Sequence, residues 1–128
     1  MLVVPDIGET TMLQTILGQP LYLRLYANNH WPDEADTTMA YEEAVFPGYM
    51  AEMLLPTSWD YRTGIEAVHI DIEFRAQKFA GQFIYGYYVT TMADVLLWAE
   101  RFVGEGVPYP MVNNDDRIIV SPRFAFVD

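Results

Sequence analysis

The chain contains no cysteine, and only seven basic residues and two histidines occur among its 128 positions. Without cysteine, neither a disulfide framework nor a thiolate metal site can form. The formal net charge is −11, and a surface this acidic repels nucleic acid backbones and anionic membranes. The sequence therefore predicts that neither nucleic acid nor a membrane is a partner.

Long apolar runs and catalytic motifs are also missing. No apolar stretch approaches the roughly 20 residues of a membrane-spanning helix. Residues 1–6 lack the basic and apolar regions of a secretory signal, so we do not expect one. No GxSxG, P-loop, GxGxxG or HExxH motif occurs, and the two serines, Ser58 and Ser121, stand outside a nucleophile-elbow context. We predict a protein that is not an enzyme and uses no cofactor.

Aromatic side chains are abundant instead. They make up 15% of the chain, with nine tyrosines and three tryptophans, and 52% of all residues are hydrophobic. This composition suits the faces of β-sheets and protein interfaces, and it is too hydrophobic for a disordered chain. The length is that of a single domain over residues 1–128, large enough to bury a core of its own.

The beginning of the chain predicts a short N-terminal arm and one helix within residues 1–18. Asp6 and Glu9 have the spacing of a capping box. Apolar residues then recur at roughly helical intervals up to residue 17, and Gly18 and Pro20 end the pattern.

The rest of the chain is typical of antiparallel β-structure. Residues 21–26 and 68–75 alternate between apolar and polar, and in the second run Val68, Ile70, Ile72 and Phe74 are expected on the core face. Residues 83–90 and 95–102 are apolar on both faces and are expected to form a hairpin. Its strands are therefore either central in a sheet or covered by a neighbouring subunit.

The last predicted strand covers residues 117–126. Pro122 within it indicates an edge position or a bulge, because proline cannot donate to the ladder. Together these segments predict a mainly β fold, an antiparallel β-sandwich or barrel-like domain of about 6–8 strands with one short N-terminal helix.

Acidic residues concentrate in the middle of the chain. Residues 31–73 hold ten of the 18 acidic residues and one base, Arg62. Such a face serves solubility, or it meets the basic surface of a partner.

Two features have the residue types of a metal site. His69, Asp71 and Glu73 would share one face of a strand, where imidazole and carboxylate can bind a metal. The alternation of residues 68–75 explains this pattern without a ligand, and we therefore predict no metal there. Whether the acidic turns 33–36 and 113–116 bind a cation is left open, since Asn and Asp also favour ordinary turns.

Four segments carry a resemblance to a known family. They are LRLYANN (23–29), YEEAVFPGY (41–49), IYGYYV (84–89) and LWAERF (97–102). They resemble small virion structural proteins of tailed bacteriophages, and the similarity runs from about residue 2 to residue 126. These motifs belong to sheets and turns, so the resemblance brings no catalytic residue with it.

The resemblance implies a capsid cement or decoration protein on the virion surface. Such proteins act as homodimers or homotrimers that bind the major capsid protein at capsomer junctions and stabilise the shell. The aromatic excess would then supply an interface, for which we predict Tyr85, Tyr87, Trp98, Trp31 and Trp59. The alternative is a tail-associated receptor- or carbohydrate-binding module, in which exposed Trp31 and Trp59 would stack on sugars.

Overall fold

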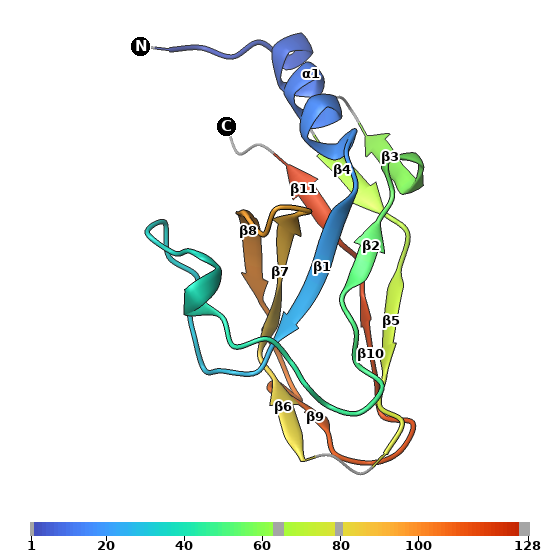
Figure 1. Cartoon of the computed structure of the whole chain (residues 1–128). Coiled ribbons are helices and arrows are strands. Elements are labelled where there is room, and N and C mark those ends of the chain that lie inside the picture. Colours follow the sequence, from blue (N-terminus) through green and yellow to red (C-terminus); the bar gives the residue numbers. More distant parts are fainter. Residues whose placement is uncertain (1, 63–65, 79–80, 126–128) are drawn as a thin grey trace.

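We describe the protein from a computed structural model, in which residues 2–62, 66–78 and 81–125 are described (Figure 1). One α-helix precedes eleven short strands, and two short 3-10 helices lie in the loops. The elements are α1 (Asp6–Leu17), β1 (Leu21–Tyr26), η1 (Thr38–Ala40), β2 (Glu52–Leu54), η2 (Pro56–Ser58), β3 (Trp59–Arg62), β4 (Glu66–His69), β5 (Ile72–Arg75), β6 (Gln82–Ile84), β7 (Gly86–Thr91), β8 (Leu96–Arg101), β9 (Tyr109–Met111), β10 (Arg117–Val120) and β11 (Arg123–Ala125).

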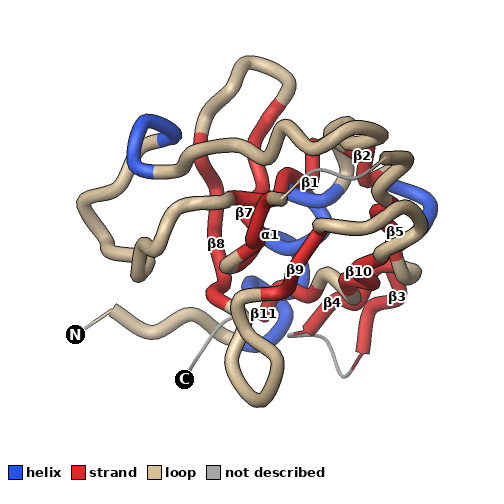
Figure 2. The backbone as a smooth tube through the Cα atoms, turned by 90° about the horizontal axis from the view of Figure 1, so that it is seen from below, coloured by secondary structure: helices blue, strands red, loops and turns tan. Residues whose placement is uncertain are grey.

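The strands form two layers around an apolar core. One layer is the four-stranded sheet β2-β1-β7-β8, and the other contains the pair β5-β10 and the sheet β3-β4-β11. Figure 2, seen from below, shows β7 and β8 on one side of the molecule and β3, β5 and β10 on the other. Helix α1 covers one end of the sandwich, and the ribbon β6-β9 lies at the other end (Figure 1). All pairings are antiparallel, so the predicted β-sandwich with an N-terminal helix is confirmed. The sheets do not close into a barrel.

Helix α1 begins differently from the prediction. Its N-cap is Pro5, in extended conformation, and no side chain caps the helix. The capping box is therefore wrong, because Pro5 takes the position expected for Asp6, which becomes the first helical residue. Leu13 and Leu17 are completely buried in the core, so packing onto the sandwich holds the helix in place.

The four-stranded sheet confirms the expected faces of β1 and gives β7 a central position. Leu21, Leu23 and Leu25 are fully buried. β7 lies between β1 and β8 and is buried on both faces. β8 is an edge strand, since it pairs only with β7 in the described sheets. The central position is thus confirmed for β7 and does not hold for β8. For β8 the alternative, cover by a neighbouring subunit, stays a prediction.

The run 68–75 is two strands rather than one. It breaks after His69, where the Ile70 amide donates to Ser58 O at 3.2 Å instead of continuing a regular ladder. The break reverses the faces, so His69 is 3% exposed and Ile70 is 63% exposed. The predicted alternation therefore holds in β5, where Phe74 is buried, and fails in β4.

A second break lies directly opposite the first. β10 pairs with β5 and β11 pairs with β4, and Pro122 lies between β10 and β11. Pro122 is fully buried and accepts a hydrogen bond from the His69 amide at 2.9 Å. The two paired segments, β4–β5 and β10–β11, thus bend at the same place and pass from one sheet to the next. Residue 126, the last of the predicted strand, lies outside the described residues.

A third run, 83–90, also breaks, at Tyr85. Its first part is β6, paired with β9, and its second part is β7. These three corners divide three of the predicted strands into two each, and β2, β3 and β9 are further strands outside the predicted segments, so the described chain has eleven short strands where about 6–8 were expected.

Candidate functional site: a groove beside strand β8

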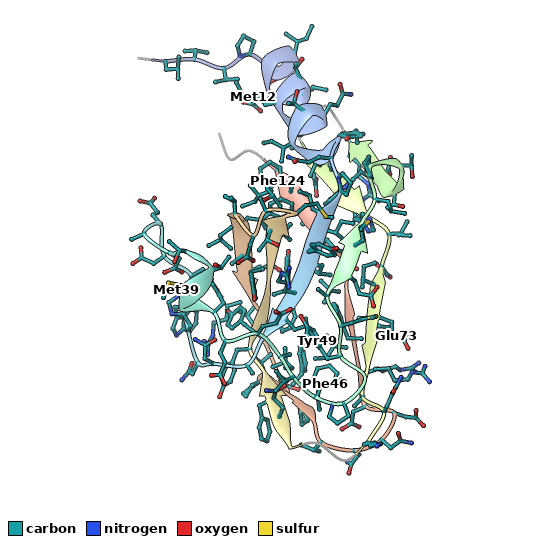
Figure 3. All side chains as sticks on the ribbon, viewed as in Figure 1. Met12, Met39, Phe46, Tyr49, Glu73 and Phe124 are labelled. Carbon is teal, nitrogen blue, oxygen red and sulfur yellow. The ribbon has the colours of Figure 1, made fainter. Side chains whose placement is uncertain are left out.

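The loop 27–41 projects from the end of β1 and returns past β8 (Figures 1 and 2). It carries the 3-10 helix η1 and the exposed side chain of Met39, which lies well away from the sheets (Figure 3). A loop of this length needs internal contacts to hold one conformation, and its own polar residues provide them.

Asp36 is the centre of these contacts. One oxygen of its carboxylate, Oδ2, lies 2.7 Å from Nε2 of His30, and it accepts hydrogen bonds from the Tyr41 hydroxyl at 2.8 Å and the Asp33 amide at 2.9 Å. Hydrogen bonds to the ionised form, first from His30 and then from the Asp33 amide, lower the pKa of Asp36 from 3.8 to about 2. The carboxylate therefore ties both ends of the loop together over the ordinary pH range.

A cluster of three tyrosines attaches the loop to the sheet. Tyr41 packs edge-on against Tyr26 and stacks on Tyr88, with ring centroids 5.0 Å apart in both pairs. The Tyr26 hydroxyl donates to His30 O at 3.2 Å. Burial raises the pKa of Tyr26 to about 12, so its hydroxyl stays protonated and remains a donor. The loop is thus fixed against β1 and β7 by a small aromatic core of its own.

Arg101 of β8 fixes the near end of the loop. Its guanidinium lies over the rings of Trp31, at 4.2 Å, and Tyr85, at 5.2 Å, and donates to His30 O at 3.0 Å. A cation between two aromatic rings is a favourable arrangement at a protein surface. Trp31 is still 65% exposed, so this contact holds the tryptophan in place and leaves part of it open to a partner.

A groove separates the tip of the loop from β8. Its volume is about 370 Å³, and it lies between residues 32–36 with Tyr41 on one side and residues 96–99 on the other. A second hollow of about 300 Å³ continues it towards Asp94 and shares Asp36 and Leu96 with the first. We call these two hollows the β8 groove. Its rim is acidic, because Asp33, Glu34 and Asp94 are all exposed.

The five aromatic residues predicted for an interface separate into two groups. Trp31, Tyr85 and Trp98 gather on the β8 side of the molecule, where Trp98 lines the groove and the other two flank Arg101. Tyr87 and Trp59 lie in the core, 2% and 7% exposed. The expectation that Trp59 is exposed is wrong, because its ring packs edge-on against His69 and Trp98. Tyr87 likewise has no surface to offer a partner.

His69, Asp71 and Glu73 do not come together. His69 points into the core, where burial lowers its pKa, and its Nδ1 lies 2.7 Å from Ile70 O. Asp71 accepts a hydrogen bond from the Ser121 hydroxyl at 2.5 Å. Glu73 pairs with Arg75 on the outer face, where Figure 3 shows it directed away from the core. No group of three or more His, Asp or Glu side chains in the described part of the chain is arranged to hold a metal ion.

The two acidic turns use their aspartates to fix their own backbones. Asp36 does so as described above. In the second turn Asp116 accepts hydrogen bonds from the amides of Val112, at 3.1 Å, and Asn113, at 2.9 Å. These contacts are the usual role of aspartate in a turn, and they account for both residues without a cation.

Sequence patterns did not reveal the groove or the network around Asp36. The spacing of Asp33 and Asp36 indicates a turn, but nothing in it indicates that His30 and Tyr41 meet the same carboxylate. The edge position of β8 depends on strand order, which the alternation of its own residues does not encode.

Comparisons with protein families, curated proteins and solved structures find no match to this chain. The resemblance to phage virion proteins therefore stays a prediction. Among the described residues, no helix has both the length and the apolar character needed to cross a membrane.

Proposed function

We propose that this chain is a non-enzymatic structural protein of a tailed-bacteriophage virion, a capsid cement or decoration protein that binds the major capsid protein. The observation that carries the proposal is the open β8 groove, which has an acidic rim, is lined in part by Trp98 and begins at Pro32, next to the exposed ring of Trp31. A polar rim around partly exposed aromatic groups is the usual composition of a protein-binding surface.

The roles of the chain's histidines and of its part-buried ion pair support a binding role. His30 and Asp36 fix the loop, and His69 lies in the core. Arg24 donates two hydrogen bonds to Glu43, at 3.0 and 3.1 Å, and the Tyr49 hydroxyl donates to the same carboxylate. These residues hold the fold together, which is the expected use of such groups in a binding module.

A second surface suits self-association as a dimer or trimer. The N-terminal arm and the outer side of α1 expose the apolar side chains Leu2, Val3, Ile7 and Met12. Figure 1 shows the arm extending away from the sandwich, and Met12 points outward from the helix in Figure 3. Exposed apolar groups gathered at one end of a domain favour burial against another chain.

The alternative, a carbohydrate-binding module, required both Trp31 and Trp59 at the surface, and only Trp31 is there. Trp59 is in the core, and one face of Trp31 is occupied by Arg101. A stacking platform of these two residues therefore does not exist on the described surface, and the capsid-binding proposal is preferred.

The test is to mix the purified protein with expanded phage capsids that lack decoration. We expect the protein to co-sediment with the capsids and to raise the temperature at which they disrupt, because a ligand that binds only the intact shell stabilises it. Absence of co-sedimentation, together with unchanged heat stability of the capsids, would overturn the proposal.

A further inference from the structure

The outer edge of β8 is available for strand pairing. β8 pairs only with β7 in the described sheets, and the amide of Phe102, just beyond it, donates to Tyr85 O at 3.0 Å. In an antiparallel pair, every second residue bonds to the same neighbour. Glu100 therefore faces β7, while Ala99 and Arg101 present their backbone N–H and C=O groups to the outside.

The β8 groove lies along this edge. Four consecutive residues, 96–99, line it, although consecutive side chains of a strand point to opposite faces. A hollow that contacts all four must run along the edge of the strand rather than over one face. The loop 32–36 forms the opposite wall, so the space beside the strand is open and bounded on both sides.

The charge of the rim selects the occupant. Asp33 and Glu34 line the first hollow and Asp94 the second, and all three are exposed. Neither hollow has lysine or arginine in its lining, and Arg101 of β8 already contacts Trp31, Tyr85 and His30 O. A second copy of this chain, with its net charge of −11, would be repelled by such a rim, whereas lysine and arginine would be attracted.

We propose that the β8 groove binds one extended, basic segment of a partner protein, which adds to the outer edge of β8 as an antiparallel or parallel strand. Backbone hydrogen bonds to Ala99 would supply affinity, and the rim carboxylates would supply selectivity for basic side chains. The inference rests on the proposed function only in that the partner is a protein.

The test uses the intact protein and synthetic peptides of about eight residues, long enough to span β8. The first peptide alternates lysine and valine, the second alternates glutamate and valine, and the third is the lysine peptide with alternate backbone nitrogens methylated. Binding is measured by calorimetry at low salt, and the chemical shift of the Ala99 backbone amide is followed by NMR. We expect the lysine peptide to bind and to shift Ala99, and the other two to bind at least about tenfold more weakly.

A pair of charge-matched variants locates the binding. Asp33→Lys/Glu34→Lys changes the rim, and Asp60→Lys/Glu105→Lys makes the same change of net charge at exposed residues outside the lining of the groove. We expect the first variant to lose about tenfold in affinity for the lysine peptide and the second to lose less than about twofold. Equal losses in both variants, equal binding of the methylated peptide, or no binding of the lysine peptide would each overturn the inference.

The same variants, tested on capsids, separate this inference from the proposed function. Capsid binding without peptide binding would overturn strand addition at β8 and leave the capsid role standing. Peptide binding without capsid binding would overturn the capsid role and leave the groove as a docking site for another basic partner.

Discussion

Among the described glycines, Gly86, the first residue of β7, is the one where an added carbon would make the closest contact. A Cβ at Gly86 would meet the backbone oxygen of Glu100 on β8, and it would lie 2.6 Å from both Cε1 and the hydroxyl oxygen of Tyr26. Separations under 3.0 Å are essentially never seen for Cβ atoms. One neighbour is backbone and the other is a buried ring, so neither can move away freely.

These contacts set the size of the effect of Gly86→Ala. Replacing glycine in a strand normally stabilises by about 0.5–1 kcal/mol, whereas overpacking a core costs about 1–3 kcal/mol and occasionally more. With backbone among the clashing groups the upper end applies, and we expect a net loss of about 2–3 kcal/mol in the free energy of unfolding. Because Tyr26 also holds His30, the loop 27–41 should loosen along with the sheet.

Urea unfolding followed by tryptophan fluorescence measures this loss. At a slope of about 2 kcal/mol/M, the midpoint should fall by about 1–1.5 M. The control is Gly8→Ala in helix α1, where the nearest contact of the added carbon is the Val4 side chain at 3.3 Å and helix propensity predicts a gain of up to about 1 kcal/mol. A Gly86→Ala protein within about 0.5 kcal/mol of the parent would refute the packing argument.

Two further predictions concern charged groups. The folded-state pKa of Asp36 is depressed from 3.8 to about 2. The stability that its ionised carboxylate contributes is therefore complete above about pH 4 and is lost as the pH falls towards 2. By NMR the carboxyl carbon of Asp36 should titrate near pH 2, and a midpoint near 4 would contradict the network. Glu43→Gln removes the charged acceptor shared by Arg24 and Tyr49. It should lower the free energy of unfolding, measured in urea, by about 1–3 kcal/mol, and by less when Arg24→Met is already present. Additive effects of the two substitutions would contradict the pairing.

Local patterns predicted the elements whose neighbours agree with them. Leu21, Leu23 and Leu25 alternate with more polar residues, and β1 has that buried face. β7 is apolar on both faces, and it is the strand with partners on both edges and burial on both sides. In these strands, the neighbours in space require the same faces that the local sequence indicates.

Local patterns do not predict the strands in which contacts distant in the sequence override the local alternation. The alternation of residues 68–75 is perfect, but Pro122 and Ser58 take the hydrogen bonds of His69 and Ile70 and divide the run. No window of eight residues contains that information. The burial of Trp59 has the same origin, because its neighbours His69 and Trp98 belong to other strands.

Of the candidate site, the sequence predicts only the kinds of residue, acidic and aromatic, and not their arrangement. The concentration of acidic residues in 31–73 indicates a charged face, and the aromatic excess predicts Trp31, Tyr85 and Trp98 for an interface, which stays a prediction. The sequence could not show that β8 is an edge strand, nor that a loop fixed through Asp36 lies opposite it. Both facts come from strand order and from contacts across the sheet, which no single segment specifies.

Ionic strength should act on the β8 groove and on self-association in opposite directions. Exposed charges interact over about 10 Å at 0.1 M salt and over about 3 Å at 1 M, so the attraction between the rim carboxylates and a lysine peptide weakens as salt rises. Backbone pairing at β8 does not change, and some affinity should remain.

Repulsion between copies of net charge −11 is screened too, so that burial of the apolar arm and helix α1 becomes easier. Titrating the lysine peptide and measuring sedimentation from about 0.05 M to about 0.5 M salt should therefore show weaker peptide binding and stronger self-association. Peptide affinity that does not change with salt would mean that the carboxylates of Asp33, Glu34 and Asp94 do not select the occupant of the groove.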